Sequence, residues 1–384
     1  MMNRLAFAQL YCAVRRKGAV VLCVGLCMLG LGLSGSAQEG TFTTFDAPGA
    51  GTGSGQGTFA IGIVSSGTIG GYYVDAGGVE HGFLRAKDGT ITTFDAPGAG
   101  TGSGQGTEAY GLNPAGAVAG FYTDDSGVSH GYLRAPSGAF TTFDAPGAGT
   151  GSGQGTLAGN INPAGTIAGY YINENGALHG FVRAVGGAIT TFDAPGSGTG
   201  SGQGTNVALF AGLNPAGAIT GDYVDASGVG HAYARSAGGV ITTFDAPGAG
   251  NTAPEGTFGA SINADGWIAG FLAPANDSGV GFLRSPAGVI TEFHAPGTGT
   301  GPQQGTVGEN INPANQIAGY YIDPNGVDHG FSRSNGGGFF TFEAPGAGTG
   351  PGQGTIANSN DPANGITGVY TDSNGAEHGF LLTP

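Results

Sequence analysis

The stretch TLAGNINPAGTIAGYYINENGALHGFVRAVGGAITTFDAP, residues 156–195, contains four short apolar runs separated by turn sequences. Residues 162–165 read NPAG, with Asn, Pro and Gly at the positions that a type I turn favours. Residues 173–176 read NENG and residues 185–187 read VGG, and these follow the second and third runs. Runs of this length between such turns predict four antiparallel strands connected in sequence.

The same pattern recurs through the chain. The phrase FDAPG, with minor variants, recurs every 49 residues, apart from one interval of 52, starting at Phe45, Phe94, Phe143, Phe192, Phe244, Phe293 and Phe342. A repeat of four short strands over about 40–50 residues is typical of a propeller blade. The sequence therefore predicts an all-β fold, a seven-bladed β-propeller with four antiparallel strands per blade.

The two ends of the repeat array are offset from each other. The last unit stops at Pro384 after three strand-like runs, and the run that corresponds to the fourth stands at residues 41–48. An N-terminal strand that completes the last blade would close the ring and leave no exposed sheet edge. We therefore expect the ring to be closed by this strand.

The composition favours a folded chain in spite of its glycine content. Of the 384 residues 83 are Gly and 20 are Pro, but 39% are hydrophobic and only 10% are charged. Collagen is excluded because Gly follows no three-residue period. The formal net charge of −15 disfavours binding to nucleic acid or to an anionic membrane surface.

The first 37 residues have the features of a secretory signal peptide. A segment with Arg15, Arg16 and Lys17 precedes an apolar run at residues 18–33, and small residues follow before Ala37. Cleavage there would leave residues 38–384 as a single propeller domain without cysteine or membrane span, located outside the cell or in its envelope. A 16-residue run with four glycines is short for an uncleaved anchor, the alternative.

The repeat resembles a bacterial family. The strings INPAGTIAGYY at residues 161–171 and GALHGFVR at residues 176–183 look like those of the HAF-type extracellular repeat proteins. The resemblance covers essentially residues 41–384 and implies an exported repeat protein. It brings no reaction and no catalytic residues.

Six units carry a histidine in the third run, and the fifth unit has Val280 there instead; the six are His81, His130, His179, His231, His329 and His378. Equivalent positions on different blades lie too far apart to share one ion, and no blade adds a second His or Cys nearby. We therefore expect no metal site and no cofactor, and a hydrogen-bonding role between blades for these residues. The glycine-rich linkers lack the Lys and helix of a phosphate-binding loop, so we expect flexible connections.

Candidate binding residues lie where the repeat breaks. The fourth unit is three residues longer than the others, the linker that follows it is rewritten, and so is a turn of the fifth unit. In a four-stranded blade the linkers and the turns between second and third strands emerge on the same face. We therefore predict a polar recognition patch that comprises Asn206, Asn251, Glu255, Asn276 and Asp277.

Two functions remain open from the sequence. The first is a non-catalytic, monomeric binding or scaffolding propeller at the cell envelope or on extracellular polysaccharide, with a polysaccharide or an envelope protein as partner. The alternative is a carbohydrate-active hydrolase or lyase with its site at the central opening. Glu108 and Glu309, in first strands where other units have uncharged residues, are the first acids to consider for such an enzyme.

Overall fold

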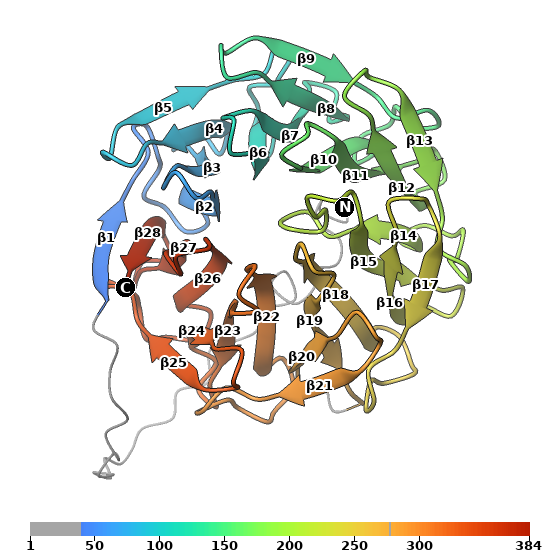
Figure 1. Ribbon diagram of the computed structural model, residues 1–384. Coiled ribbons are helices and arrows are strands. Elements are labelled where there is room, and N and C mark those ends of the chain that lie inside the picture. The colour runs from blue at the N-terminus through green and yellow to red at the C-terminus, as the bar shows by residue number, and fades with distance from the viewer. Residues whose placement is uncertain (1–39, 276–277) are drawn as a thin grey trace, which may run out of the picture.

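The computed structural model describes residues 40–275 and 278–384, and every regular element in these ranges is a β-strand. The predicted signal peptide lies outside the described residues. The strands are arranged as a ring around a central opening (Figure 1). This is the all-β, propeller-like architecture that the repeat predicts.

The strands that begin each repeat line the central opening. They are β2 (Gly57–Ile63), β6 (Gly106–Leu112), β10 (Gly155–Ile161), β14 (Gly204–Val207), β18 (Gly256–Ile262), β22 (Gly305–Ile311) and β26 (Gly354–Asn360). Most of these strands contain a bulge, at Tyr110 in β6 and at Glu309 in β22, for example, which leaves one residue without a partner in the antiparallel register. Small residues predominate in them because neighbouring strands crowd together around the opening.

The second strand of each repeat pairs antiparallel with the first. These strands are β3 (Ile69–Val74), β7 (Val118–Thr123), β11 (Ile167–Ile172), β15 (Ile219–Val224), β19 (Ile268–Ala273), β23 (Ile317–Ile322) and β27 (Ile366–Thr371). Their residues are nearly all buried on both faces, as the apolar residues at successive positions predict.

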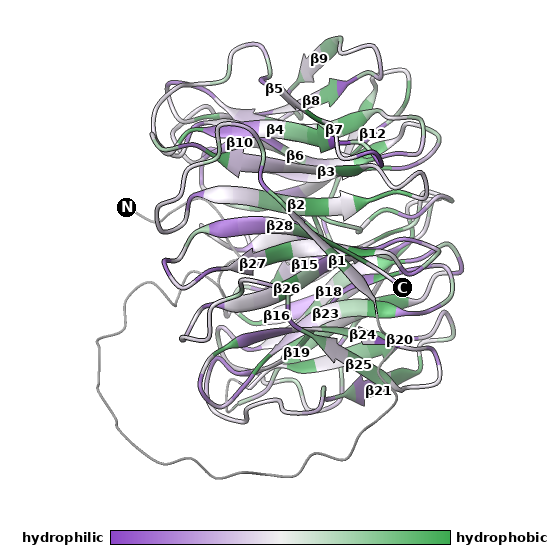
Figure 2. Cartoon of the chain, turned by 90° about the vertical axis from the view of Figure 1, so that its left-hand side faces the viewer, coloured by the Kyte–Doolittle hydropathy of each residue, from purple (hydrophilic) through white to green (hydrophobic). Residues whose placement is uncertain are grey.

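The third and fourth strands of each repeat lie further from the central opening. The four consecutively paired strands of one repeat form what we call a strand group, or group. The third strands are β4 (Glu80–Arg85), β8 (Ser129–Arg134), β12 (Leu178–Arg183), β16 (Gly230–Arg235), β20 (Val280–Arg284), β24 (Asp328–Arg333) and β28 (Glu377–Thr383). The fourth, outermost strands are β5 (Ile91–Phe94), β9 (Phe140–Phe143), β13 (Ile189–Phe192), β17 (Ile241–Phe244), β21 (Ile290–Phe293), β25 (Phe339–Phe342) and β1 (Thr41–Phe45). Figure 2 shows the groups from the side, with apolar segments in many strands and polar segments both in the loops and in parts of strands such as β28 and β16.

The N-terminal strand closes the ring. β1 pairs antiparallel with β28 along its whole length, from Thr41 opposite Thr383 to Phe45 opposite Gly379. The Phe42 ring packs between those of Phe342 and Phe380, with centroids 6.0 and 5.9 Å away. The pairing expected from the offset ends of the repeat is therefore present.

Neighbouring groups meet at a glycine that begins each innermost strand. Gly155 has φ +113°, and a Cβ atom there would lie 2.0 Å from the carbonyl oxygen of Ser129 in the preceding group. The next residue, Thr156, is fully buried and its hydroxyl accepts a hydrogen bond from the amide of Ala145, 2.9 Å away. The same Gly-Thr pair and Ala-Pro-Gly partner recur at each junction, so this repeated phrase fixes how one group follows another.

A cation–π contact also joins the groups on the outer side. The guanidinium of Arg183 in β12 lies 4.8 Å from the ring centroid of Phe143, which belongs to the preceding group. Arg85 makes the same contact with Phe45 of the closing strand. In the last group Leu382 takes the place of this arginine.

Candidate functional site

A cavity of roughly 180 Å³ lies at one end of the central opening. Its lining includes Ile63, Leu112 and Ile161, which end the innermost strands β2, β6 and β10. The glycine-rich linkers enter these strands at their opposite ends. The cavity is therefore on the face opposite to the linkers.

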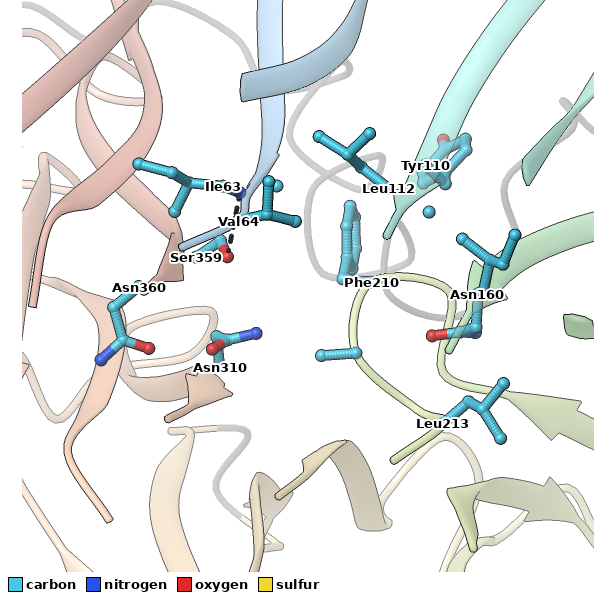
Figure 3. Close-up of a pocket in the computed structure, with 14 residues that line it drawn as sticks. Ile63, Val64, Tyr110, Leu112, Asn160, Phe210, Leu213, Asn310, Ser359 and Asn360 are labelled. Carbon is cyan, nitrogen blue, oxygen red and sulfur yellow. Dashed lines mark hydrogen bonds between the residues drawn. The ribbon is translucent and has the colours of Figure 1, made fainter. Parts of the chain in front are cut away.

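One side of the cavity is formed by the three extra residues of the fourth unit. Alignment of the repeats around β14 places the addition at residues 209–211, one residue beyond the end of the strand at Val207. Phe210 projects from this segment towards Tyr110 and Leu112 (Figure 3), and the ring centroids of Phe210 and Tyr110 are 5.5 Å apart. Together with Leu213 these residues make an apolar, aromatic side.

The other side of the cavity is polar. Asn310, Ser359 and Asn360 face Phe210 across the opening (Figure 3). The side-chain nitrogen of Asn360 donates to the backbone carbonyl of Gln316 at 3.1 Å, while the buried Oδ1 of Asn360 has no hydrogen-bond partner. Ser359 Oγ accepts a long hydrogen bond from the Ile63 amide, 3.5 Å away. The side-chain amide of Asn310 and the hydroxyl of Ser359 on this side are groups that can donate to and accept from the hydroxyl groups of a ligand.

Asn160 holds the extra segment in place. Its side-chain nitrogen donates to the carbonyl of Ala208 at 2.7 Å, and its side-chain oxygen accepts from the amide of Gly212 at 2.8 Å. The two bonds hold both ends of the segment. Asn160 is also buried, so these bonds are shielded from water.

The two acids that an enzyme would have used do not line the cavity. Glu108 is buried in β6 and accepts a hydrogen bond from the hydroxyl of Tyr110 at 2.8 Å. Glu309 is the bulge residue of β22, next to Asn310, and burial raises the pKa of its carboxyl to about 7. None of the 14 described residues that line the cavity carries a charge.

The repeated histidines form clusters near the outer edge of the ring. His81 stacks on Tyr73 with ring centroids 4.8 Å apart, and its Nδ1 lies 2.8 Å from Asp95 of the same strand group. In the third unit the amide of Asn173 approaches His179 Nε2 at 3.0 Å, so Nδ1 carries the hydrogen that Asp193 accepts. The expected bond between blades is therefore wrong: Asp95 and Asp193 follow the fourth strand of the same group, which pairs directly with the histidine's own strand.

The clusters show no metal-binding arrangement. In the ranges 40–275 and 278–384, no three His, Cys, Asp or Glu side chains gather so as to hold a metal ion. Nor does this part of the chain contain a helix that could span a bilayer.

The structure describes three of the five residues of the predicted recognition patch. Asn206 lies in β14 and is only 9% exposed, with its amide nitrogen 3.2 Å from Asp222, so its proposed place on an exposed surface is wrong. Asn251 is exposed in the linker before β18, and Glu255 in that linker accepts a hydrogen bond from the Thr252 amide. Asn276 and Asp277 lie outside the described residues.

The cavity residues were not identified from the sequence. The 52-residue interval shows which unit contains the insertion, but not towards which face of the ring the insertion extends. We predicted a recognition patch on the linker face, whereas the cavity lies on the opposite face. Another signal was present: Asn160 and Asn310 stand where the first and second units have Gly62 and Gly111. Amides in place of glycines on the innermost strands could have drawn attention to the opening.

The comparisons with known proteins concern the fold. No protein-family model matches the sequence, and no curated protein matches it. Among solved structures, the chain is similar to the BP39L lectin from Burkholderia pseudomallei, with a TM-score of 0.54 and 13% identity over 84% of this chain and 94% of that one. This likeness agrees with the all-β ring.

Two further solved structures resemble the chain more weakly. One is the Aleuria aurantia lectin, described as a six-bladed β-propeller, with a TM-score of 0.40 and 12% identity over 77% of this chain and 96% of that one. The other is AofleA from Arthrobotrys oligospora, with a TM-score of 0.43 and 14% identity over 79% and 90%.

Proposed function

We propose that this protein is a non-catalytic propeller that binds carbohydrate in the cavity at the end of its central opening. The observation that carries the proposal is the division of that cavity into an aromatic side, with Tyr110 and Phe210, and an amide and hydroxyl side, with Asn310, Ser359 and Asn360. The fold alone does not imply a function.

This division suits the chemistry of a sugar ring. A pyranose has a face of C–H groups, which packs against an aromatic ring, and an edge of hydroxyl groups, which need donors and acceptors. The uncharged lining favours a neutral sugar over a uronic acid or a phosphate. That the B. pseudomallei relative is called a lectin is consistent with this class of ligand.

The architecture and the location belong to the same proposal. Each run of four paired strands would be one blade, which gives seven blades with β1 completing the last. Residues 38–384 would be one exported domain, and residues 1–37 its signal peptide. A protein of this kind would act in the cell envelope or outside the cell, where polysaccharides are its partners. The HAF-type resemblance supports the same location.

Binding can be tested with a panel of methyl glycosides of neutral hexoses, deoxyhexoses and N-acetylhexosamines, measured by calorimetry. We expect at least one to bind, and Asn310→Ala to weaken its binding about tenfold, because a lost hydrogen bond costs about 1–1.5 kcal/mol. Asn251→Ala, on the opposite face, is the matched control and should leave affinity unchanged.

Other results would contradict the proposal. If Asn251→Ala weakened binding and Asn310→Ala did not, the linker face would be the site. Release of reducing sugar from an oligosaccharide by the wild-type protein would show that it is an enzyme. No binding to any member of the panel would remove the carbohydrate proposal.

A further inference from the structure

We infer that the insertion at residues 209–211, positioned by Asn160, is the specificity element of this cavity and restricts it to a single terminal sugar residue. The inference rests on the proposed function, since it concerns the same site. It goes further in naming the part of the glycan that enters and the residues that select it.

The insertion is anchored to three strand groups. Asn160 of the third group bonds to the backbone at both of its ends. Within the fourth group, the Thr220 amide donates to the Gly212 carbonyl at 2.9 Å. From the fifth group, the Ile262 amide donates to the Ala211 carbonyl at 3.0 Å. A segment with bonds to three neighbours is a fixed part of the site, not an unconstrained loop.

The preceding strand also leaves space for the insertion. Gly159 is the bulge residue of β10, and a Cβ atom there would lie 2.5 Å from a methyl group of Leu209 and 2.7 Å from its carbonyl oxygen. The equivalent positions in two other strands carry Tyr110 and Glu309. Glycine at this one position lets the insertion reach across the third group and bring Phe210 to Tyr110.

The position of Phe210 limits the size of the ligand. Leu209 and Phe210 pack against the apolar cluster that includes Ile61, Tyr110 and Leu157, on the side of the opening formed by the first groups. The space that remains, roughly 180 Å³, is smaller than the approximately 300–1,000 Å³ of pockets for larger ligands. One sugar ring can lie between Phe210 and Asn310, whereas a chain that continues in both directions would meet the insertion.

The test compares ligand length in wild-type protein and three variants. The ligands are the methyl glycoside that binds best and the linear oligosaccharides of two to six residues that end in the same sugar. The variants are Gly159→Ala, which displaces Leu209, Phe210→Ala, and a deletion of residues 209–211 that restores the 49-residue interval. Gly186→Ala is the control in the same strand group, because a Cβ atom there would meet nothing within 4 Å.

For the wild type we expect the same affinity for all lengths, because only the terminal residue makes contact. Gly159→Ala and Phe210→Ala should lower the affinity for the monosaccharide at least tenfold, and Gly186→Ala should leave that affinity unchanged. The deletion should make affinity increase with chain length. Melting temperatures and circular dichroism spectra identify any variant that fails to fold, and Phe210→Ala, which leaves the backbone bonds of the insertion unchanged, then serves as the decisive variant.

The possible failures are distinct. If the wild type binds a glycoside but affinity rises with chain length, or if Phe210→Ala and Gly159→Ala bind normally, the inference is wrong and the proposed function stands. If the wild type binds no glycan, both are wrong. Asn160→Ala adds a further check of positioning: it removes the bonds to Ala208 and Gly212 at both ends of the insertion, so it should weaken binding of the monosaccharide, and normal binding by this variant would contradict the role of Asn160.

Discussion

Asp222 occupies a place in the second strand of its unit where the other units have an aromatic residue such as Tyr72 or Phe121, or in the last unit Val369. It is 5% exposed, and its Oδ1 accepts a hydrogen bond from Asn206, which replaces the apolar Phe59 or Leu157 of other units. The other oxygen of Asp222 and the Oδ1 of Asn206 are buried without partners. Burial raises the pKa of the Asp222 carboxyl to about 7.

This raised pKa predicts that Asp222 lowers stability as the pH rises. The carboxyl has a pKa of about 3.9 in the unfolded chain, so between about pH 4 and pH 7 the folded protein holds a proton that the unfolded chain has lost. The free energy of unfolding should therefore fall through this window, by roughly 4 kcal/mol from this group, and stay low above pH 7. Urea unfolding from pH 4 to pH 8 measures the slope.

Asp222→Asn should flatten this dependence, because an amide can donate to the Oδ1 of Asn206 at every pH. We expect the variant to be more stable than the wild type at pH 8 and similar to it at pH 4. Part of the slope should remain, since burial also raises the pKa of Glu309 to about 7. Asp125→Asn, at an exposed turn, is the control, and an unchanged slope in Asp222→Asn would show that Asp222 ionises freely in the fold.

The glycine-rich linkers are held in place by hydrogen bonds, contrary to the flexible connections that we expected. Gln154 accepts from the Gly151 amide at 2.8 Å and donates to the Glu174 carbonyl at 3.0 Å. The Gly153 amide donates to the carbonyl of Gly127, in a turn of the preceding group. Each linker of this kind therefore fastens the turns of two adjacent groups, and a sequence of small residues gave no sign of it.

Replacement of Gln154 by Ala should loosen one linker without unfolding the ring. A neutral hydrogen bond contributes about 0.5–1.5 kcal/mol, so hydrogen exchange at the Gly151 amide should become about two- to tenfold faster. The Gly102 amide, which Gln105 binds in the same way, is the control within the same molecule. Equal exchange at Gly151 before and after the change would mean that the glutamine does not hold the linker.

At the scale of the whole molecule, stability depends on closure. Without β1, the outer edge of β28 would be unpaired, Phe42 would no longer cover Phe342 and Phe380, and Arg85 would lose the ring of Phe45. Loss of β1 would therefore weaken the contact between the first and last groups, which closes the ring. An unpaired strand edge also favours association between molecules.

A chain that begins at Asp46 should therefore be less stable than one that begins at Gly40, by more than about 3 kcal/mol, the lower end for the loss of one core phenylalanine. It should also associate with other copies through the unpaired edge of β28. Thermal unfolding measures the loss of stability, and size-exclusion chromatography measures the association. A peptide of residues 40–48 added in excess should restore part of the melting temperature. Equal melting temperatures for the two chains would show that closure by β1 contributes little.

The sequence by itself determined the strands, their order and the partner of the N-terminal strand, because the strands depend on local turn chemistry and the other two follow from comparing the copies of the repeat along the chain. It also showed where the repeat changes length. Only the tertiary structure decided what that change does, because the direction of the insertion depends on Asn160, Gly159 and Ile262, which belong to neighbouring groups about 50 residues away. The same reason explains why Asn206 is buried: its partner is a side chain of the adjacent strand, and burial is a property of the packed ring.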